Sequence, residues 1–147
     1  MNPIERILVA TDFSAGAEAA AETALQLARQ LKASVDVINV VDTSPLIDAY
    51  GDVAFRTQRI NEIRQAAQEK TADFAAHHFR DLEGTRVYVR DGEVFLEILA
   101  AARELGSGLI VLGTHGRTGL AHLLIGSVAE KVVRKSTLPV LTVRGPH

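Results

Sequence analysis

Five short runs of apolar and β-branched residues alternate with four longer segments of helical periodicity along the chain. The runs cover residues 6–11, 34–41, 85–90, 109–112 and 139–143, and the helical segments cover residues 14–31, 53–78, 93–105 and 127–135. Strands separated by helices are joined by right-handed crossovers, which place the strands parallel in one sheet. The alternation therefore predicts one α/β domain over residues 1–147. Its open, parallel, five-stranded sheet should have the order 3-2-1-4-5, with helices on both faces, as in Rossmann-like and flavodoxin-like folds.

The helical segments carry recognisable signals at their ends and on their faces. Ser14 precedes the first segment and has the side chain of an N-cap. Small residues recur on one face of that segment, so the helix should lie close to the sheet. They are Ala17, Ala21, Ala24 and Ala28. Gly106 ends the third segment, and His77 and His78 end the second, where an imidazolium suits the helix dipole.

The stretch from residue 42 to residue 52 is the longest connection of the predicted fold. It is polar and holds Pro45 and Gly51, two residues that are common in loops. Its length suggests a functional loop rather than a domain linker. We therefore expect a lid or a ligand-shielding loop here.

The predicted strand order brings three distant segments to one place. The chain reverses its direction between the first and fourth strands, and a crevice opens at the carboxyl ends of those strands. Asp12 follows the first strand, Val40 and Val41 end the second, and Gly113 follows the fourth. We expect a ligand site where these residues meet, because such crevices are where α/β folds bind ligands.

A glycine-rich connection follows the fourth strand. It reads Gly113-Thr-His-Gly116, then nine residues, then Gly126-Ser127. Glycines let backbone amides approach an anion closely, and the N-terminus of the following helix adds free N–H groups. We expect Ser127 to act as both helix N-cap and phosphate donor, and Arg117 can pair with a phosphate. The spacing also fits an ordinary glycine-rich turn.

Other features exclude several classes of protein. The chain has no P-loop signature, and no Gly-x-Gly-x-x-Gly follows the first strand. It has no cysteine, hence no disulfide framework and no thiolate chemistry. The formal net charge of −2 gives no basic footprint for nucleic acid. No apolar run is long enough to span a bilayer and the first residues do not resemble a signal peptide, so we expect a cytoplasmic protein.

Taken together, these motifs resemble the universal stress protein family over essentially the whole chain. The resemblance includes the opening Ile-Leu-Val-Ala-Thr-Asp12-Phe-Ser14, the second strand ending Asn39-Val-Val-Asp42, and the closing Leu138-Pro-Val-Leu-Thr-Val143. Most specific is the pattern Gly113-x-x-Gly116-x₉-Gly126-Ser127, which looks like the signature of the family's ATP-binding branch. One departure is Asn39, because a histidine is frequent there in the family; we expect this change to have little effect.

The resemblance implies a role for particular residues. Asp12 would contact the ribose, and backbone groups of Val40 would recognise the adenine edge. The glycine-rich segment would hold the ribose and phosphates, with Mg²⁺ or Mn²⁺ reaching the site on the phosphates rather than on a dedicated protein ligand. The full nucleotide-binding set is Ala10, Thr11, Asp12, Val40, Gly113, Thr114, His115, Gly116, Arg117, Gly126, Ser127 and Val128. Family members commonly dimerise through the last strand, here residues 139–143.

The sequence thus predicts a small ATP-binding stress-response protein. It would act as a homodimeric, nucleotide-dependent switch toward an unknown protein partner. Two alternatives stay open: a dimeric scaffold of the same fold that binds no nucleotide, and a slow ATPase. No catalytic residues are assigned, because neither a nucleophile elbow nor a Ser–His–Asp set is present. A flavodoxin-type flavin site would need its phosphate loop after the first strand.

Overall fold

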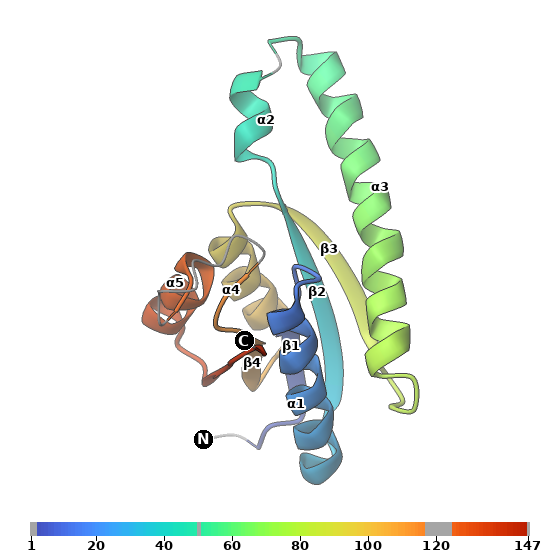
Figure 1. Cartoon of the computed structure of the whole chain (residues 1–147), viewed down its shortest axis with the longest axis vertical. Helices are drawn as coiled ribbons and strands as arrows, with labels where there is room; N and C mark the ends of the chain where they lie inside the picture. Colours follow the sequence, from blue (N-terminus) through green and yellow to red (C-terminus); the bar gives the residue numbers. More distant parts are fainter. Residues whose placement is uncertain (1–2, 50, 117–124, 147) are drawn as a thin grey trace.

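A computed structural model describes residues 3–49, 51–116 and 125–146. Its elements in chain order are β1 (Arg6–Ala10), α1 (Ala15–Leu31), β2 (Ser34–Asp42), α2 (Ser44–Ala49), α3 (Val53–His78), β3 (Arg86–Gly92), α4 (Val94–Glu104), β4 (Leu109–Gly113), α5 (Ser127–Lys135) and β5 (Val140–Val143). The strands form one sheet of order β3-β2-β1-β4-β5 (Figure 1). All neighbouring strands pair in parallel, so the predicted fold class and strand order are confirmed.

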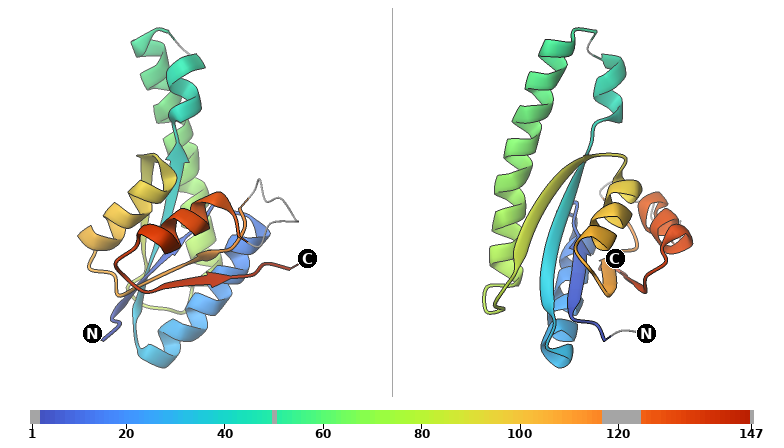
Figure 2. Two further views of the ribbon diagram at one scale, coloured as in Figure 1. Left: turned by 90° about the vertical axis from the view of Figure 1, so that its left-hand side faces the viewer. Right: turned by 180° about the vertical axis from the view of Figure 1, so that it is seen from behind.

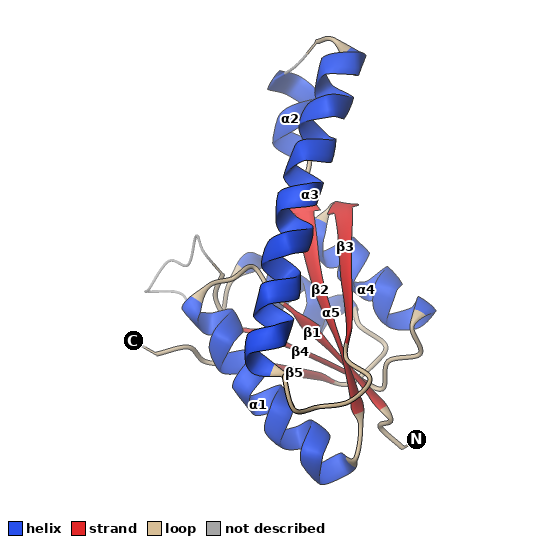
Figure 3. Ribbon diagram, turned by 90° about the vertical axis from the view of Figure 1, so that its right-hand side faces the viewer, coloured by secondary structure: helices blue, strands red, loops and turns tan. Residues whose placement is uncertain are grey.

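The central strands are apolar because both of their faces are covered. Ile7 of β1 pairs with Val35 of β2 on one side and with Leu109 of β4 on the other. Ile7, Leu8 and Val9 are fully buried, as expected for a strand inside a two-sided parallel sheet. One core cluster contains α1 and the end of α3, and the other contains α4 and α5, so each pair covers one face (Figures 2 and 3).

Helix α1 approaches the sheet very closely at its N-terminal end. Its predicted alanine stripe is buried, in agreement with the sequence analysis. A Cβ at Gly113 would lie only 2.9 Å from the backbone of Gly16, and a Cβ at Gly145 would lie 2.9 Å from the Cα of Gly16. Real Cβ atoms almost never come so near another heavy atom. Gly113 therefore has a packing role between β4 and α1, in addition to the ligand role expected from its motif.

The connection between residues 42 and 52 is not the loop that the sequence suggested. Strand β2 continues to Asp42, and a short helix, α2, follows. Asp42 Oδ1 accepts a hydrogen bond from Ser44 N at 3.0 Å, which starts α2, and Pro45 is tolerated in a first helical turn. Asp52 then caps α3 by accepting from Ala54 N at 2.9 Å.

The helix α2 and the beginning of α3 project beyond the carboxyl ends of the strands (Figures 1 and 2). We call residues 44–49 and 51–66 the arm. The first buried residue of α3 is Ala67, beyond the arm. Val53 and Phe55 within the arm are 63% and 57% exposed. No helix of the described residues, α3 with its 26 residues included, is both long and apolar enough to cross a membrane.

A buried carboxylate, Asp36, joins the three strands on the β3 side of the sheet. Arg6 of β1 donates to it at 3.0 and 2.7 Å, and Arg86 of β3 donates at 2.8 and 3.0 Å. Burial alone would raise the pKa of the Asp36 carboxyl, but the hydrogen bonds from Arg86 and Arg6 outweigh it, and the pKa lies below its ordinary 3.8. Asp36 is thus an ionised carboxylate within the fold.

The environment of His78 differs from the charged helix end that the sequence suggested. Its ring lies 4.5 Å from that of Phe74, and its Nε2 is buried with no hydrogen-bond partner in the described part of the chain. Burial and the neighbouring His77 lower the pKa of His78, although Glu18 and Glu22 act in the opposite direction. The neutral imidazole is therefore favoured, because burial disfavours the charged form.

Candidate functional site

A pocket of about 450 Å³ opens at the carboxyl ends of β1, β2 and β4. It is lined by eleven of the twelve residues predicted from the sequence, namely Ala10, Thr11, Asp12, Val40, Gly113, Thr114, His115, Gly116, Gly126, Ser127 and Val128. The twelfth, Arg117, lies outside the described residues. The lining is completed by Ser14, Ala17, Ile38, Asp42, Val94, Ile98, Leu112 and Ala129.

The turn between β1 and α1 presents Asp12 to the pocket. Phe13 N donates to Thr11 Oγ1 and Ser14 N donates to Asp12 Oδ1, both at 3.0 Å. Phe13 has a φ of 67°, in the left-handed region that few non-glycine residues adopt. Ser14 Oγ accepts from Ala17 N at 3.2 Å, which confirms Ser14 as the N-cap of α1. Asp12 therefore both supports this turn and lines the pocket.

The glycine-rich segment forms the opposite wall. Thr114 N donates to Val143 O at 2.9 Å, which ties the segment to β5, and Gly126 N donates to Thr114 O. A Cβ at Gly126 would lie 3.1 Å from Thr114 O, and a Cβ at Gly116 would collide with Oδ2 of Asp12. The glycines thus allow close approach of backbone to backbone at Gly126 and of backbone to the Asp12 carboxylate at Gly116.

Helix α5 begins at Ser127, as the sequence predicted, but its N-cap lies one residue earlier than expected. The N-cap is Gly126, with φ −75° and ψ 166°, and Ser127 is the first helical residue. Gly126 O accepts from Glu130 N at 3.0 Å, as an N-cap carbonyl should. Ser127 was therefore wrong as an N-cap: the cap is Gly126, where a Cβ would make a tight contact of 3.1 Å with Thr114 O. The backbone N–H groups of Ser127 and Val128 keep no partner within the helix.

The end of β2 forms the third wall. Thr11 N donates to Ile38 O at 2.9 Å, so the peptide groups of Ile38 face β1. In a parallel strand the peptide groups of alternate residues face the same neighbour. The peptide groups of Val40 therefore also face the β1 side of β2. Val40 lies two residues beyond Ile38, which is the last residue of β2 that pairs with β1. A donor and an acceptor of Val40 are in this way turned toward the pocket.

Several pocket residues were not identified from the sequence. Asp42 stands at the end of β2, and Val94 and Ile98 lie on α4. Val94 and Ile98 have the spacing of residues on the buried face of a helix, so the sequence pattern alone would assign them to the hydrophobic core. Asn39, for which little effect was expected, is buried, and its Nδ2 donates to Thr11 O at 2.8 Å.

Charge is unevenly distributed around the pocket. Its described ionisable residues are Asp12, Asp42 and His115. Asp12 lies in the turn between β1 and α1, and Asp42 lies at the end of β2. The N-terminus of α5, with its partial positive charge, belongs to the wall formed by the glycine-rich segment. An anionic group of a ligand would therefore be stabilised at the α5 side and repelled at the Asp12 side.

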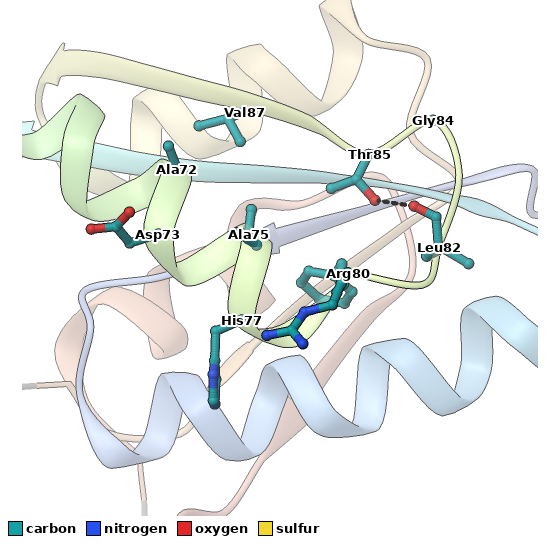
Figure 4. Close-up of a pocket in the computed structure, with 11 residues that line it drawn as sticks. Ala72, Asp73, Ala75, His77, Arg80, Leu82, Gly84, Thr85 and Val87 are labelled. Atoms are coloured by element: carbon teal, nitrogen blue, oxygen red, sulfur yellow. Dashed lines mark hydrogen bonds between the residues drawn. The ribbon is translucent and has the colours of Figure 1, made fainter.

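Two further hollows lie elsewhere. One, of about 660 Å³, lies between the end of α3 and β3 and is shown in Figure 4, where Thr85 Oγ1 donates to Leu82 O at 3.2 Å. None of the predicted site residues lines it. The other, of about 560 Å³, lies between the base of the arm and the strand ends and shares Asp12, Val40 and Asp42 with the pocket at the strand ends. The predicted site residues of the described chain therefore gather in the pocket at the strand ends.

Comparison with known proteins gives a consistent result. A model of the universal stress protein family matches residues 3–144. The chain is similar to universal stress protein MJ0531 of Methanocaldococcus jannaschii, at 34% identity over 149 residues that cover 99% of this chain and 85% of that protein. The solved structure of MJ0577 from the same organism has a TM-score of 0.83 at 29% identity and covers 99% of both chains. A universal stress protein from Archaeoglobus fulgidus in complex with dAMP shares the fold, with a TM-score of 0.64 at 24% identity over 97% of this chain and 99% of that one. The chain therefore belongs to the universal stress protein family.

Proposed function

We propose that this protein binds an adenine nucleotide, with ATP as its main ligand, and acts as a small regulatory protein of the stress response. The observation that carries the proposal is the pocket itself: residues from four separate chain segments, singled out by their sequence motifs, line one hollow. Its volume of about 450 Å³ lies within the range of small-molecule sites. The dAMP complex of the Archaeoglobus fulgidus protein indicates that this fold can hold such a ligand.

The proposed orientation follows from the donors and acceptors of each wall. The N–H and C=O of Val40 match an adenine edge, which offers an acceptor beside the N6 donor. Asp12 suits the ribose, because a carboxylate accepts hydrogen bonds from hydroxyls and repels phosphates. The phosphates then lie at the α5 N-terminus, against the N–H groups of Ser127 and Val128. Mg²⁺ or Mn²⁺ would arrive bound to the phosphates and lower their charge.

The first test is chemical identification of the ligand. Freshly purified protein is denatured, and any released nucleotide is identified by chromatography and mass spectrometry. Near-stoichiometric ATP or ADP supports the proposal, and AMP or cyclic AMP would assign a shorter ligand to the same pocket. Protein that is empty, and that gives a flat titration with ATP and magnesium, would instead support a scaffold that binds no nucleotide.

We place the switch in the arm, because Asp42 contacts both regions. Asp42 lines the pocket, and its Oδ1 accepts from both Ser44 N and Ser44 Oγ at the start of α2. A ligand that moves this carboxylate thus also changes the start of the arm. The exposed Val53 and Phe55 lie farther along the arm, where a reorientation would change the surface offered to a protein partner.

Amide hydrogen exchange of the arm tests this switch. ATP with magnesium is expected to change amide exchange in residues 44–60 of the wild type. In Asp42→Ala that change should be abolished, while ATP should still protect the amides of the pocket residues. Asp52→Ala is the matched control: it removes the α3 cap but does not touch the pocket, so it should loosen the arm and preserve the response to ATP. Identical arm exchange with and without ATP in the wild type would rule out the switch.

We also propose a homodimer through β5, an outer strand of the sheet. Val143 O accepts from Thr114 N, so the peptide groups of Leu141 and Val143 face β4 and those of Val140 and Thr142 face the open edge. A second copy pairing along this edge in antiparallel fashion would cover it symmetrically.

Sedimentation at micromolar concentration is expected to give a dimer for the wild type. Thr142→Pro removes an outward N–H and leaves the bonds to β4 in place, so it should shift the protein toward monomer without unfolding it. Leu141→Pro, the matched variant one residue away, should instead destabilise the fold, because it removes a donor that faces β4. A wild type that sediments as a monomer contradicts the dimer.

A further inference from the structure

The pairing of β1 with β2 ends in an unusual way beside the pocket. Thr11 N donates to Ile38 O, and Ala10 and Ile38 are the last paired residues of this ladder. In a regular parallel ladder the next hydrogen bond would run from Val40 N–H to the carbonyl of Thr11. Here that carbonyl accepts from the side chain of Asn39, whose Nδ2 lies 2.8 Å away.

Asn39 is well placed to donate to the Thr11 carbonyl in place of Val40. Its residue is only 8% exposed, so the amide is held in the protein rather than in water. Its own peptide groups face β3, where Asn39 pairs with Val89, and only its side chain reaches Thr11. Thr11 O accepts from the Asn39 amide, and among the described residues it accepts no hydrogen bond from the Val40 N–H. The Val40 N–H instead stays turned toward the pocket that Val40 lines.

We propose that Asn39 is a positioning residue for base recognition. By taking the Thr11 carbonyl, it ends the β1–β2 ladder one hydrogen bond early and makes the Val40 N–H available to the ligand. Without the Asn39 amide, Val40 would complete the ladder with Thr11, because a buried carbonyl seeks a donor. The proposal rests on the proposed adenine site, since it assigns the residue that prepares Val40 for the base.

The ligand-free protein gives the first readout, amide exchange of Val40 measured by NMR. In the wild type the Val40 amide should exchange about tenfold or more faster than that of Ile38, whose carbonyl and N–H lie within the ladder. In Asn39→Val the Val40 amide should become protected without any ligand. Asn39→His restores an N–H donor at this position and should return the fast exchange.

Affinity gives the second readout. Asn39→Val should bind ATP about tenfold more weakly than the wild type, the usual cost of one lost hydrogen bond, and should discriminate less between ATP and GTP. A merely structural loss would weaken both nucleotides equally and leave that ratio unchanged. Asn39→His should keep the wild-type ratio.

The outcomes separate this inference from the proposed function. A wild-type protein that binds no nucleotide would contradict the proposed function. The amide exchange of Val40 in the ligand-free protein would still test the role of Asn39. Equal Val40 exchange in the wild type and in Asn39→Val overturns the inference, and so does an unchanged ATP-to-GTP ratio in a variant that still binds ATP. Thermal unfolding confirms that each variant is folded, and Asn39→Ala serves as the second donor-free variant if the valine form does not fold.

Discussion

Replacing Asp36 with alanine is expected to lower the free energy of unfolding by about 3 kcal/mol, a loss typical of breaking a buried ion pair from one side. The substitution removes the acceptor of four hydrogen bonds and leaves Arg6 and Arg86 facing each other across β2. The value is at the lower end of the usual range, because the arginine side chains are 26% and 45% exposed and can regain water. Urea unfolding at neutral pH measures the change.

Glu62→Ala is the matched control for Asp36→Ala. Glu62 also accepts from an arginine, Arg59, but both side chains are about half exposed. An exposed pair of this kind contributes about 0–1 kcal/mol, so Glu62→Ala should be nearly silent. Equal losses in the two variants would show that Asp36 is no more important than a surface charge.

The same carboxylate predicts how stability depends on pH. Because the folded-state pKa of Asp36 lies below 3.8, the ionised group stabilises the fold above that value, and this contribution is lost as pH falls through the folded-state pKa. The advantage of the wild type over Asp36→Asn should therefore be constant near neutral pH and shrink below pH 3.8. A difference that stays constant down to strongly acidic pH would contradict an ionised Asp36.

Replacing Gly116 with valine is expected to weaken ATP binding by about 100-fold or more, a loss of about 2.8 kcal/mol in binding free energy. A Cβ at Gly116 would collide with Oδ2 of Asp12, the carboxylate assigned to the ribose. Gly116 is exposed, so the fold should survive the change. Calorimetric titration with ATP and magnesium measures the loss, and thermal unfolding confirms the fold.

Two other glycines give this prediction its controls. Gly51 has open space around its Cβ position, so Gly51→Val makes the same chemical change without a collision and should leave ATP affinity unchanged. Gly113→Val should instead unfold or strongly destabilise the protein, because Gly113 packs against the backbone of Gly16. Normal ATP affinity in Gly116→Val would show that the nucleotide does not lie beside Asp12.

The sheet could be predicted from the sequence because its signals are local. Runs such as residues 6–11 are apolar on both faces, and the alternation with helices fixes parallel pairing. Helix α2 was missed because it has no such local signal. Its six residues include Pro45, show no helical period and have the composition of a loop. Its hydrogen bonds to Asp42 appear only once β2 is seen to continue to that residue.

The candidate site was predictable where a motif or the chain reversal pointed to it. Gly116 and Gly126 belong to a spaced glycine pattern, and Asp12 follows a strand at the reversal point. The roles of Asn39 and Asp36 depend instead on strand register, which decides which carbonyl or guanidinium each side chain meets. No spacing along the chain contains that information, so Asn39 was expected to matter little and Asp36 was not singled out.

NMR titration of the nucleotide-free protein with ATP and magnesium tests whether the pocket at the strand ends binds ATP. We expect saturable shifts centred on the amides of Val40, Ser127 and Val128, with the hollow between α3 and β3 unaffected. Shifts absent up to millimolar ATP, or confined to residues away from these three walls, would contradict ATP binding in this pocket.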